Sequence, residues 1–151
     1  MRKKIEQAQA HYDAGELEPA FSGFLAAAED GDVHAMCQVA SMYSCGEGVR
    51  CNHGKALEWE IRSWEGGNLS AAVNVAITYR TMGDIVEAKK WFERAIESGD
   101  GDAALQLAKL CLVSDKETDK VRALLGIAIA DDGNCQESIE EAKALLEAMA
   151  R

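Results

Sequence analysis

The stretch GDVHAMCQVASMYSCGEGVRCNHGKALEWEIRSWEGGN, residues 31–68, decides the fold, because it begins with Gly-Asp and ends with Gly-Asn. A Gly followed by Asp or Asn returns along the chain, so that Gly31, Gly67, Gly99 and Gly133 stand 36, 32 and 34 residues apart. A period of this length is typical of a solenoid built from stacked helical units. A solenoid works mainly by presenting a shaped surface, so the period favours a binding protein before any site is considered.

Residues of one kind recur when each unit is counted from its glycine. Small residues stand four and nine positions beyond, and mostly larger ones twelve positions beyond: Ala35, Ala71 and Ala103; Ala40, Ala76, Ala108 and Ala142; Tyr43, Tyr79, Cys111 and Leu145. Positions eight, nine and twelve share one face of a helix, so each unit is expected to open with a helix that packs this face against a neighbour.

A second helix is expected to end each unit. Trp59 and Trp91 lie eight residues before their glycines, and Ala56 and Ala88 lie three residues before those tryptophans. The glycine is expected to stop this helix in the left-handed conformation, and the Asp or Asn after it to cap the next helix by accepting a backbone hydrogen bond.

The first full unit resembles a Sel-1-like repeat, a branch of the tetratricopeptide-like helical repeats. Residues 35–49, with the Gly46-x-Gly48-Val49 loop, and residues 55–59 carry the resemblance. The second unit has a shorter loop at Gly83, the third is degenerate, and residues 1–30 look like a further divergent pair. The resemblance covers nearly the whole chain.

The resemblance implies an all-α, right-handed αα-solenoid of about four antiparallel helix pairs and a C-terminal capping helix. We expect one domain over residues 1–151, with units at about 1–31, 32–67, 68–99 and 100–133 and the capping helix at 134–151. The glutamates of the last segment would solvate its outer side.

The resemblance also implies that a protein partner lies against a concave surface lined by the first helix of each pair. The positions that packing leaves free on those helices are His34, Cys37, Ser41, Ser44, Cys45, Ser70, Val73, Ile77, Arg80, Thr81, Asp102, Leu105, Lys109 and Leu112. Such a mixture of apolar and polar groups suits a protein-binding surface. The alternative for Val73, Ile77, Leu105 and Leu112 is that they only fill space between helices.

Charge narrows the class of partner. The chain has 26 Asp and Glu against 16 Lys and Arg, a net charge of -10, which repels phosphate backbones and disfavours nucleic acid. A basic protein partner is the natural complement, although acidity also serves solubility. No apolar stretch is long enough for a membrane span, and the basic N-terminus runs on without a secretory apolar region, so we expect a cytoplasmic protein with reduced cysteines.

Catalytic, cofactor and metal sites are not expected. None of the three histidines falls in a motif with a nucleophile and an acid, and the Gly46-Glu-Gly48 loop lacks the third glycine of a dinucleotide loop. The best metal candidate is the set Cys37, Cys45, Cys51, His34 and His53. Its spacing is not that of paired zinc ligands, so free thiols are the preferred interpretation.

Trp64 stands where the resembled family prefers a small residue, so it either repacks the core locally or forms an exposed anchor. The preferred function is a non-enzymatic protein-protein interaction module, monomeric, that acts as scaffold, adaptor or inhibitor. The alternatives are an immunity protein that neutralises a basic bacterial toxin, and a hydrolase of the kind suggested for some members of the resembled family.

Overall fold

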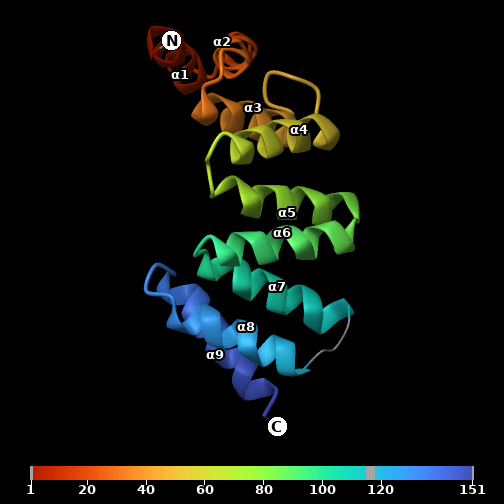
Figure 1. Cartoon of the computed structure of the whole chain (residues 1–151). Coiled ribbons are helices and arrows are strands. Elements are labelled where there is room, and N and C mark those ends of the chain that lie inside the picture. The colour runs from red at the N-terminus through yellow and green to blue at the C-terminus, as the bar shows by residue number, and fades with distance from the viewer. Residues whose placement is uncertain (1, 115–117, 151) are drawn as a thin grey trace. The chain divides into compact units, whose positions relative to one another are not determined.

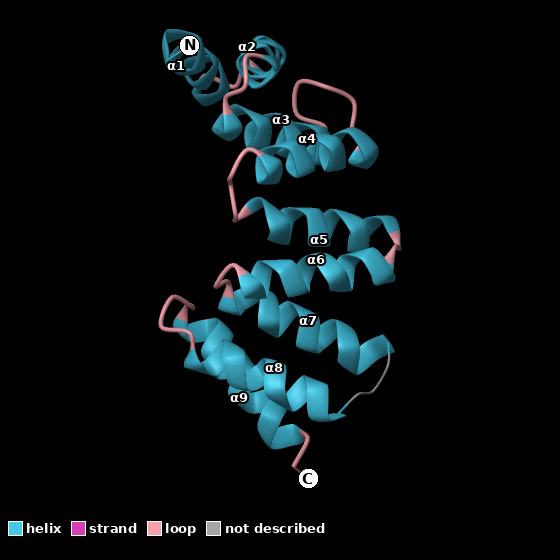
Figure 2. Cartoon of the chain, viewed as in Figure 1, coloured by secondary structure: helices cyan, strands magenta, loops and turns pink. Residues whose placement is uncertain are grey.

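The computed structural model describes residues 2–114 and 118–150, and the described residues form nine α-helices and no strand (Figures 1 and 2). The helices are α1 (Arg2–Asp13), α2 (Leu17–Glu29), α3 (Val33–Cys45), α4 (His53–Glu65), α5 (Ala71–Met82), α6 (Ile85–Glu97), α7 (Gly101–Ser114), α8 (Thr118–Ala130) and α9 (Gln136–Ala148). The all-α prediction, with a last helix after the paired ones, is confirmed. None of the described helices combines the length and the apolar character that a membrane crossing requires.

The helices fall into two compact units, Met1–Asp84 and Ile85–Arg151. In the first unit each of α1 to α4 packs against the next helix along the chain. In the second unit each of α6 to α8 does the same, with a further contact between α7 and α9. The boundary lies between the two helices of the predicted unit 68–99. The organisation as one domain stays a prediction.

The recurring small residues belong to the buried core of both units. Ala35, Ala40, Ala71, Ala76, Ala103, Ala108 and Ala142 are each at most 1% exposed. An alanine side chain lets two helix backbones approach closely, so these positions set the spacing between neighbouring helices. The packing role predicted for them is confirmed.

The repeated tryptophans fill the space beside the second set of alanines. Trp59 and Trp91 are 8% and 5% exposed, while Ala56 and Ala88 have no exposed surface. An arginine one turn later covers each ring, with the guanidinium carbon of Arg62 4.7 Å from the ring centroid of Trp59, and that of Arg94 4.3 Å from Trp91. The buried ring and the stacked cation therefore form one repeated element.

The Gly-Asp junctions have the predicted geometry at two places. Gly31 and Gly99 have φ values of 94° and 92°, the left-handed region that glycine adopts without strain. The carboxylate of Asp32 accepts a hydrogen bond from the Ala35 amide at 2.8 Å, and that of Asp100 accepts one from the Ala103 amide at 2.9 Å. Helix stop and helix start are thus made by adjacent residues.

The Gly-Asn junctions correct the prediction. Gly67 is left-handed, with φ 97°, but the Asn68 side chain donates to Cys37 and Ser63, and α5 begins at Ala71 with no side-chain cap from Ser70. The Asn134 amide donates to the Ala128 carbonyl oxygen at 2.8 Å, and Cys135 precedes α9 instead. The reason is chemical, since an asparagine amide can donate as well as accept.

The loop after α3 is held against the N-terminal helices. Gly48 has φ 66°, and a Cβ atom there would lie 2.1 Å from the carbonyl oxygen of Leu17. The Tyr12 hydroxyl donates to the Glu47 carboxylate at 3.0 Å. This hydrogen bond and the negative charge of Glu47 raise the pKa of Tyr12, so it remains a donor over a wider pH range.

Candidate functional site

A pocket of about 200 Å³ in the first unit collects residues from α3, α4 and α5. The lining residues are Cys37, Ser41, Ser44, Glu60, Asn74, Ile77 and Thr78, and we call this the Glu60 pocket. Four of them, Cys37, Ser41, Ser44 and Ile77, belong to the surface predicted from the sequence. The structure therefore brings together predicted positions of two different repeats.

Glu60 is the unusual residue of this pocket, because it carries a carboxylate into a buried position of α4. Only 5% of the surface of Glu60 is exposed to solvent. Oε1 accepts a hydrogen bond from the Thr78 hydroxyl at 3.0 Å, whereas Oε2 is buried and accepts none from any of the described residues. Burial raises the pKa of Glu60, and the hydrogen bond from Thr78 opposes that rise.

The repeat itself shows how unusual this polar pair is. Glu60 follows Trp59, and the residue that follows Trp91 in the next repeat is Phe92, which has no exposed surface. Thr78 lies eleven residues after Gly67, and the residue eleven after Gly31 is Met42, 1% exposed. Buried apolar side chains therefore occupy the equivalent positions in the neighbouring repeats. At the pocket, two polar side chains that interact with each other, Glu60 and Thr78, stand in their place.

The wall of the pocket at Cys37 is fixed by a network of hydrogen bonds. The Asn68 amide donates to Cys37 Sγ at 3.0 Å and to Ser63 Oγ at 3.2 Å, and Ser63 Oγ lies 3.0 Å from Cys37 Sγ. Ser63 in turn donates to the carbonyl oxygen of Val33 at 3.2 Å. Cys37 thus has a defined orientation before any partner binds.

The other predicted positions of the first unit do not line the pocket. His34, Cys45, Ser70 and Thr81 are exposed, and Val73 and Arg80 are half-buried. The Thr81 hydroxyl donates to the carbonyl oxygen of Ile77 within its own helix at 2.9 Å.

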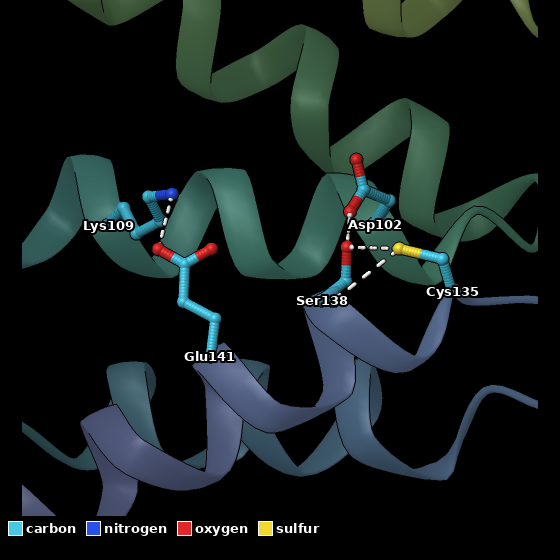
Figure 3. A network of polar contacts seen from close by, with 5 residues as sticks. All are labelled: Asp102, Lys109, Cys135, Ser138 and Glu141. Carbon is cyan, nitrogen blue, oxygen red and sulfur yellow. Dashed lines mark hydrogen bonds and ion pairs between the residues drawn. The ribbon is translucent and has the colours of Figure 1, made fainter.

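In the second unit two of the four predicted positions, Asp102 and Lys109, make polar contacts with α9 (Figure 3). The Ser138 hydroxyl donates to Asp102 at 2.9 Å, and the Lys109 ammonium lies 2.7 Å from a carboxylate oxygen of Glu141. Leu105 is 1% exposed and is part of the core, which is the space-filling alternative for that residue, and Leu112 is half-buried. Leu105 is therefore removed from the candidate surface.

Cys135 belongs to the same network in Figure 3. Its sulfur lies 3.2 Å from the Ser138 hydroxyl and accepts from the Ser138 amide at 3.5 Å. The Ser138 hydroxyl can turn its one proton from Asp102 to the sulfur, and this hydrogen bond, together with the one from the Ser138 amide, favours the thiolate and lowers the pKa of Cys135.

The predicted metal candidate does not assemble into a ligand set. Cys51 Sγ lies 4.0 Å from His53 Nε2 and also donates to the carbonyl oxygen of Ser44. Within residues 2–114 and 118–150, no group of three or more His, Cys, Asp or Glu side chains could hold a metal ion. All five cysteines are free thiols, and Trp64 is half-buried.

A second pocket, in the second unit, differs from the Glu60 pocket in its charged groups. Its volume is about 330 Å³, and its lining includes Asp100, Asp131 and Ile127. Both carboxylates already accept backbone hydrogen bonds, Asp100 from Ala103, and Asp131 from Gly101 at 2.9 Å. These aspartates serve chain turns and offer less to a ligand than Glu60 does.

Solved structures with a similar fold include Sel1 repeat proteins. A Sel1 repeat protein from Oxalobacter formigenes superposes with a TM-score of 0.72 at 21% identity over 95% of this chain. The chain has a Sel1-like repeat fold. A second structure with the same TM-score, at 18% identity over 98% of this chain, is c5321, a protective antigen of uropathogenic Escherichia coli strains that displays the SLR fold.

The chain spans 59% of the length of the Oxalobacter protein and 38% of the length of c5321. No family model matches its sequence, and no curated protein matches it. The likeness therefore concerns the fold, and the predicted solenoid class is confirmed by it.

Proposed function

We propose that this chain is a protein-interaction module that binds a protein partner at the Glu60 pocket and the exposed residues around it. The observation that carries the proposal is the gathering of Cys37, Ser41, Ser44 and Ile77 around one pocket between α3, α4 and α5. Ile77, 36% exposed, supplies an apolar contact beside hydroxyl and amide groups. Apolar and polar groups mixed in this way suit a partner-binding surface.

The partner is expected to be basic, because the chain carries a net charge of -10. Complementary charge accelerates encounter and selects among partners. Intramolecular hydrogen bonds hold the side chains of Cys37, Glu60 and Thr78 at the pocket, so binding requires little ordering there. The chain then acts by covering the surface of the partner that it contacts. Scaffolding is one outcome of such occupancy. Neutralisation of a basic toxin is the other, and the acidity of the chain is the observation that favours it.

The test is affinity capture with variants of one exposed residue in each unit. Ile77→Arg places a bulky cation at the mouth of the Glu60 pocket, and Val113→Arg makes the same change at a position that is 85% exposed in the second unit. We expect Ile77→Arg to lose a partner that the wild type and Val113→Arg retain.

The identity and behaviour of the captured protein separate the two roles. A single basic protein whose activity falls on binding indicates an inhibitor, and several partners with unchanged activities indicate a scaffold. Equal capture by Ile77→Arg and the wild type contradicts the assignment of the surface. Substrate turnover without a stable partner contradicts the module itself.

A further inference from the structure

We propose that the Glu60 pocket receives the cationic head of one lysine or arginine side chain of the protein partner, which pairs with the Glu60 carboxylate. This inference rests on the proposed function and names the chemistry that the partner presents. It starts from a buried carboxylate of which one oxygen, Oε2, accepts no hydrogen bond from residues 2–114 or 118–150.

An unpartnered carboxylate oxygen is costly inside a protein. Burial without a hydrogen bond removes the favourable contacts that water gives to a carboxylate, and the interior returns none of them. At the equivalent position of the following repeat, directly after Trp91, the chain carries the buried apolar residue Phe92. A charged residue at a position that an aromatic residue fills elsewhere indicates a use for the charge.

The pocket has the size and the lining for a cation on an apolar stem. Its volume of about 200 Å³ exceeds what one water needs and accommodates the end of a long side chain. Ser41, Ser44 and Asn74 offer oxygen atoms to the donors of a cation, and Ile77 offers an apolar surface to its methylene groups.

The hydrogen bond from Thr78 leaves the carboxylate free to pair on its other side. Thr78 donates to Oε1 only, and the terminal torsion of a glutamate is soft, so Oε2 can turn toward a donor in the pocket. A hydrogen bond to an ionised group is stronger than one between neutral groups. A cation would therefore supply the hydrogen-bond donor and the positive charge that the fold does not provide at Glu60 Oε2.

The test uses small probes and nuclear magnetic resonance of the whole chain. n-Butylammonium and n-butylguanidinium carry the two cationic heads, and 1-butanol carries the same stem without charge. We expect saturable shifts of the Asn74 and Thr78 amides and of the Glu60 side-chain carboxyl carbon with a cation, and binding weaker by about tenfold or more with 1-butanol. The cation that binds more tightly identifies the side chain.

The control variants separate charge at the pocket from charge on the helix. Glu60→Gln keeps the shape and removes the charge, while Glu58→Gln removes the same charge from an exposed position of the same helix. Glu60→Gln is expected to lose about tenfold or more in cation affinity, and Glu58→Gln less than twofold. Ser41→Phe, at an exposed position that lines the pocket, is expected to block the probe while leaving Glu60 in place.

Equal binding of 1-butanol and the cations overturns the proposal, as does unchanged cation binding by Glu60→Gln or the absence of saturable shifts. The outcome is distinct from that of the capture experiment. If Ile77→Arg abolishes capture while Glu60→Gln captures the partner with unchanged affinity, the module stands and the cation pocket fails.

Discussion

Replacement of Gly48 by alanine should destabilise the first unit far more than the same replacement at Gly46, two residues earlier. Both glycines are left-handed, with φ 66° at Gly48 and 75° at Gly46, so both alanines carry a backbone cost of about 1 kcal/mol. At Gly46 the nearest atom to a new Cβ lies at 3.4 Å, an ordinary contact. At Gly48 the Cβ would lie 2.1 Å from the Leu17 carbonyl oxygen and 2.9 Å from the Glu18 nitrogen.

The backbone atoms at Leu17 and Glu18 cannot rotate away as a flexible side chain can, so the loop itself must move in the Gly48 variant. Movement of the loop breaks the hydrogen bond from Tyr12 to Glu47 and loosens nearby packing, which adds about 1–2 kcal/mol. The expected losses are about 2–3 kcal/mol for Gly48→Ala and about 1 kcal/mol for Gly46→Ala.

Urea unfolding followed by far-ultraviolet circular dichroism measures both losses in matched conditions. A thermal scan should show the same order, since about 1 kcal/mol lowers the Tm of a chain of this size by about 2–4 °C. Equal stabilities for the two variants would refute the argument that the close approach of the loop to α2 requires glycine at residue 48.

Three further outcomes follow from single side chains. Glu60→Gln should be more stable than the wild type at neutral pH, by on the order of 1 kcal/mol, because the buried charge is removed. Since the pKa of Glu60 is raised in the folded protein, the wild type loses stability as the pH rises from the ordinary glutamate range through the folded pKa. Chemical unfolding measured across that pH window should show no such loss for the variant. Asp32→Ala should lose about 1 kcal/mol with its cap at Ala35, and a midpoint equal to that of the wild type in urea would contradict the cap. Ser138→Ala removes the hydroxyl and keeps the backbone amide, so it should raise the pKa of Cys135 part of the way toward that of an ordinary thiol, and alkylation of Cys135 should then need a higher pH. An unchanged dependence of the alkylation rate on pH would contradict the hydrogen bond from the Ser138 hydroxyl.

The helical class, the alanine core and the tryptophan positions could be predicted from the sequence because each follows from a repeated spacing. Backbone geometry at Gly31 and Gly99 and the caps at Asp32 and Asp100 follow from residue types with one strong preference. Asn68 could not be placed in the same way, because its partners Cys37 and Ser63 come from two other helices and only the folded chain brings them together.

Only part of the candidate site could be predicted from the sequence. Ser41 and Ile77 were predicted from their places on helix faces, whereas Glu60 was missed because a glutamate in an amphipathic helix usually faces water. The one signal for it was internal, since Phe92 follows the other repeated tryptophan. The helix face predicts Lys109 on the partner-binding surface, and the sequence predicts the last segment only as a capping helix. In the structure Lys109 forms an ion pair with Glu141 of α9.

The stacked tryptophan and arginine pairs give each compact unit its own spectroscopic reporter. Trp59 lies in the first unit and Trp91 in the second, and both indoles are shielded from solvent. In repeat proteins neighbouring units are coupled only through local contacts, so their unfolding need not coincide. With Trp64 replaced by phenylalanine and one of the two remaining indoles removed in turn, emission spectra would follow each half separately and reveal how strongly the halves cooperate.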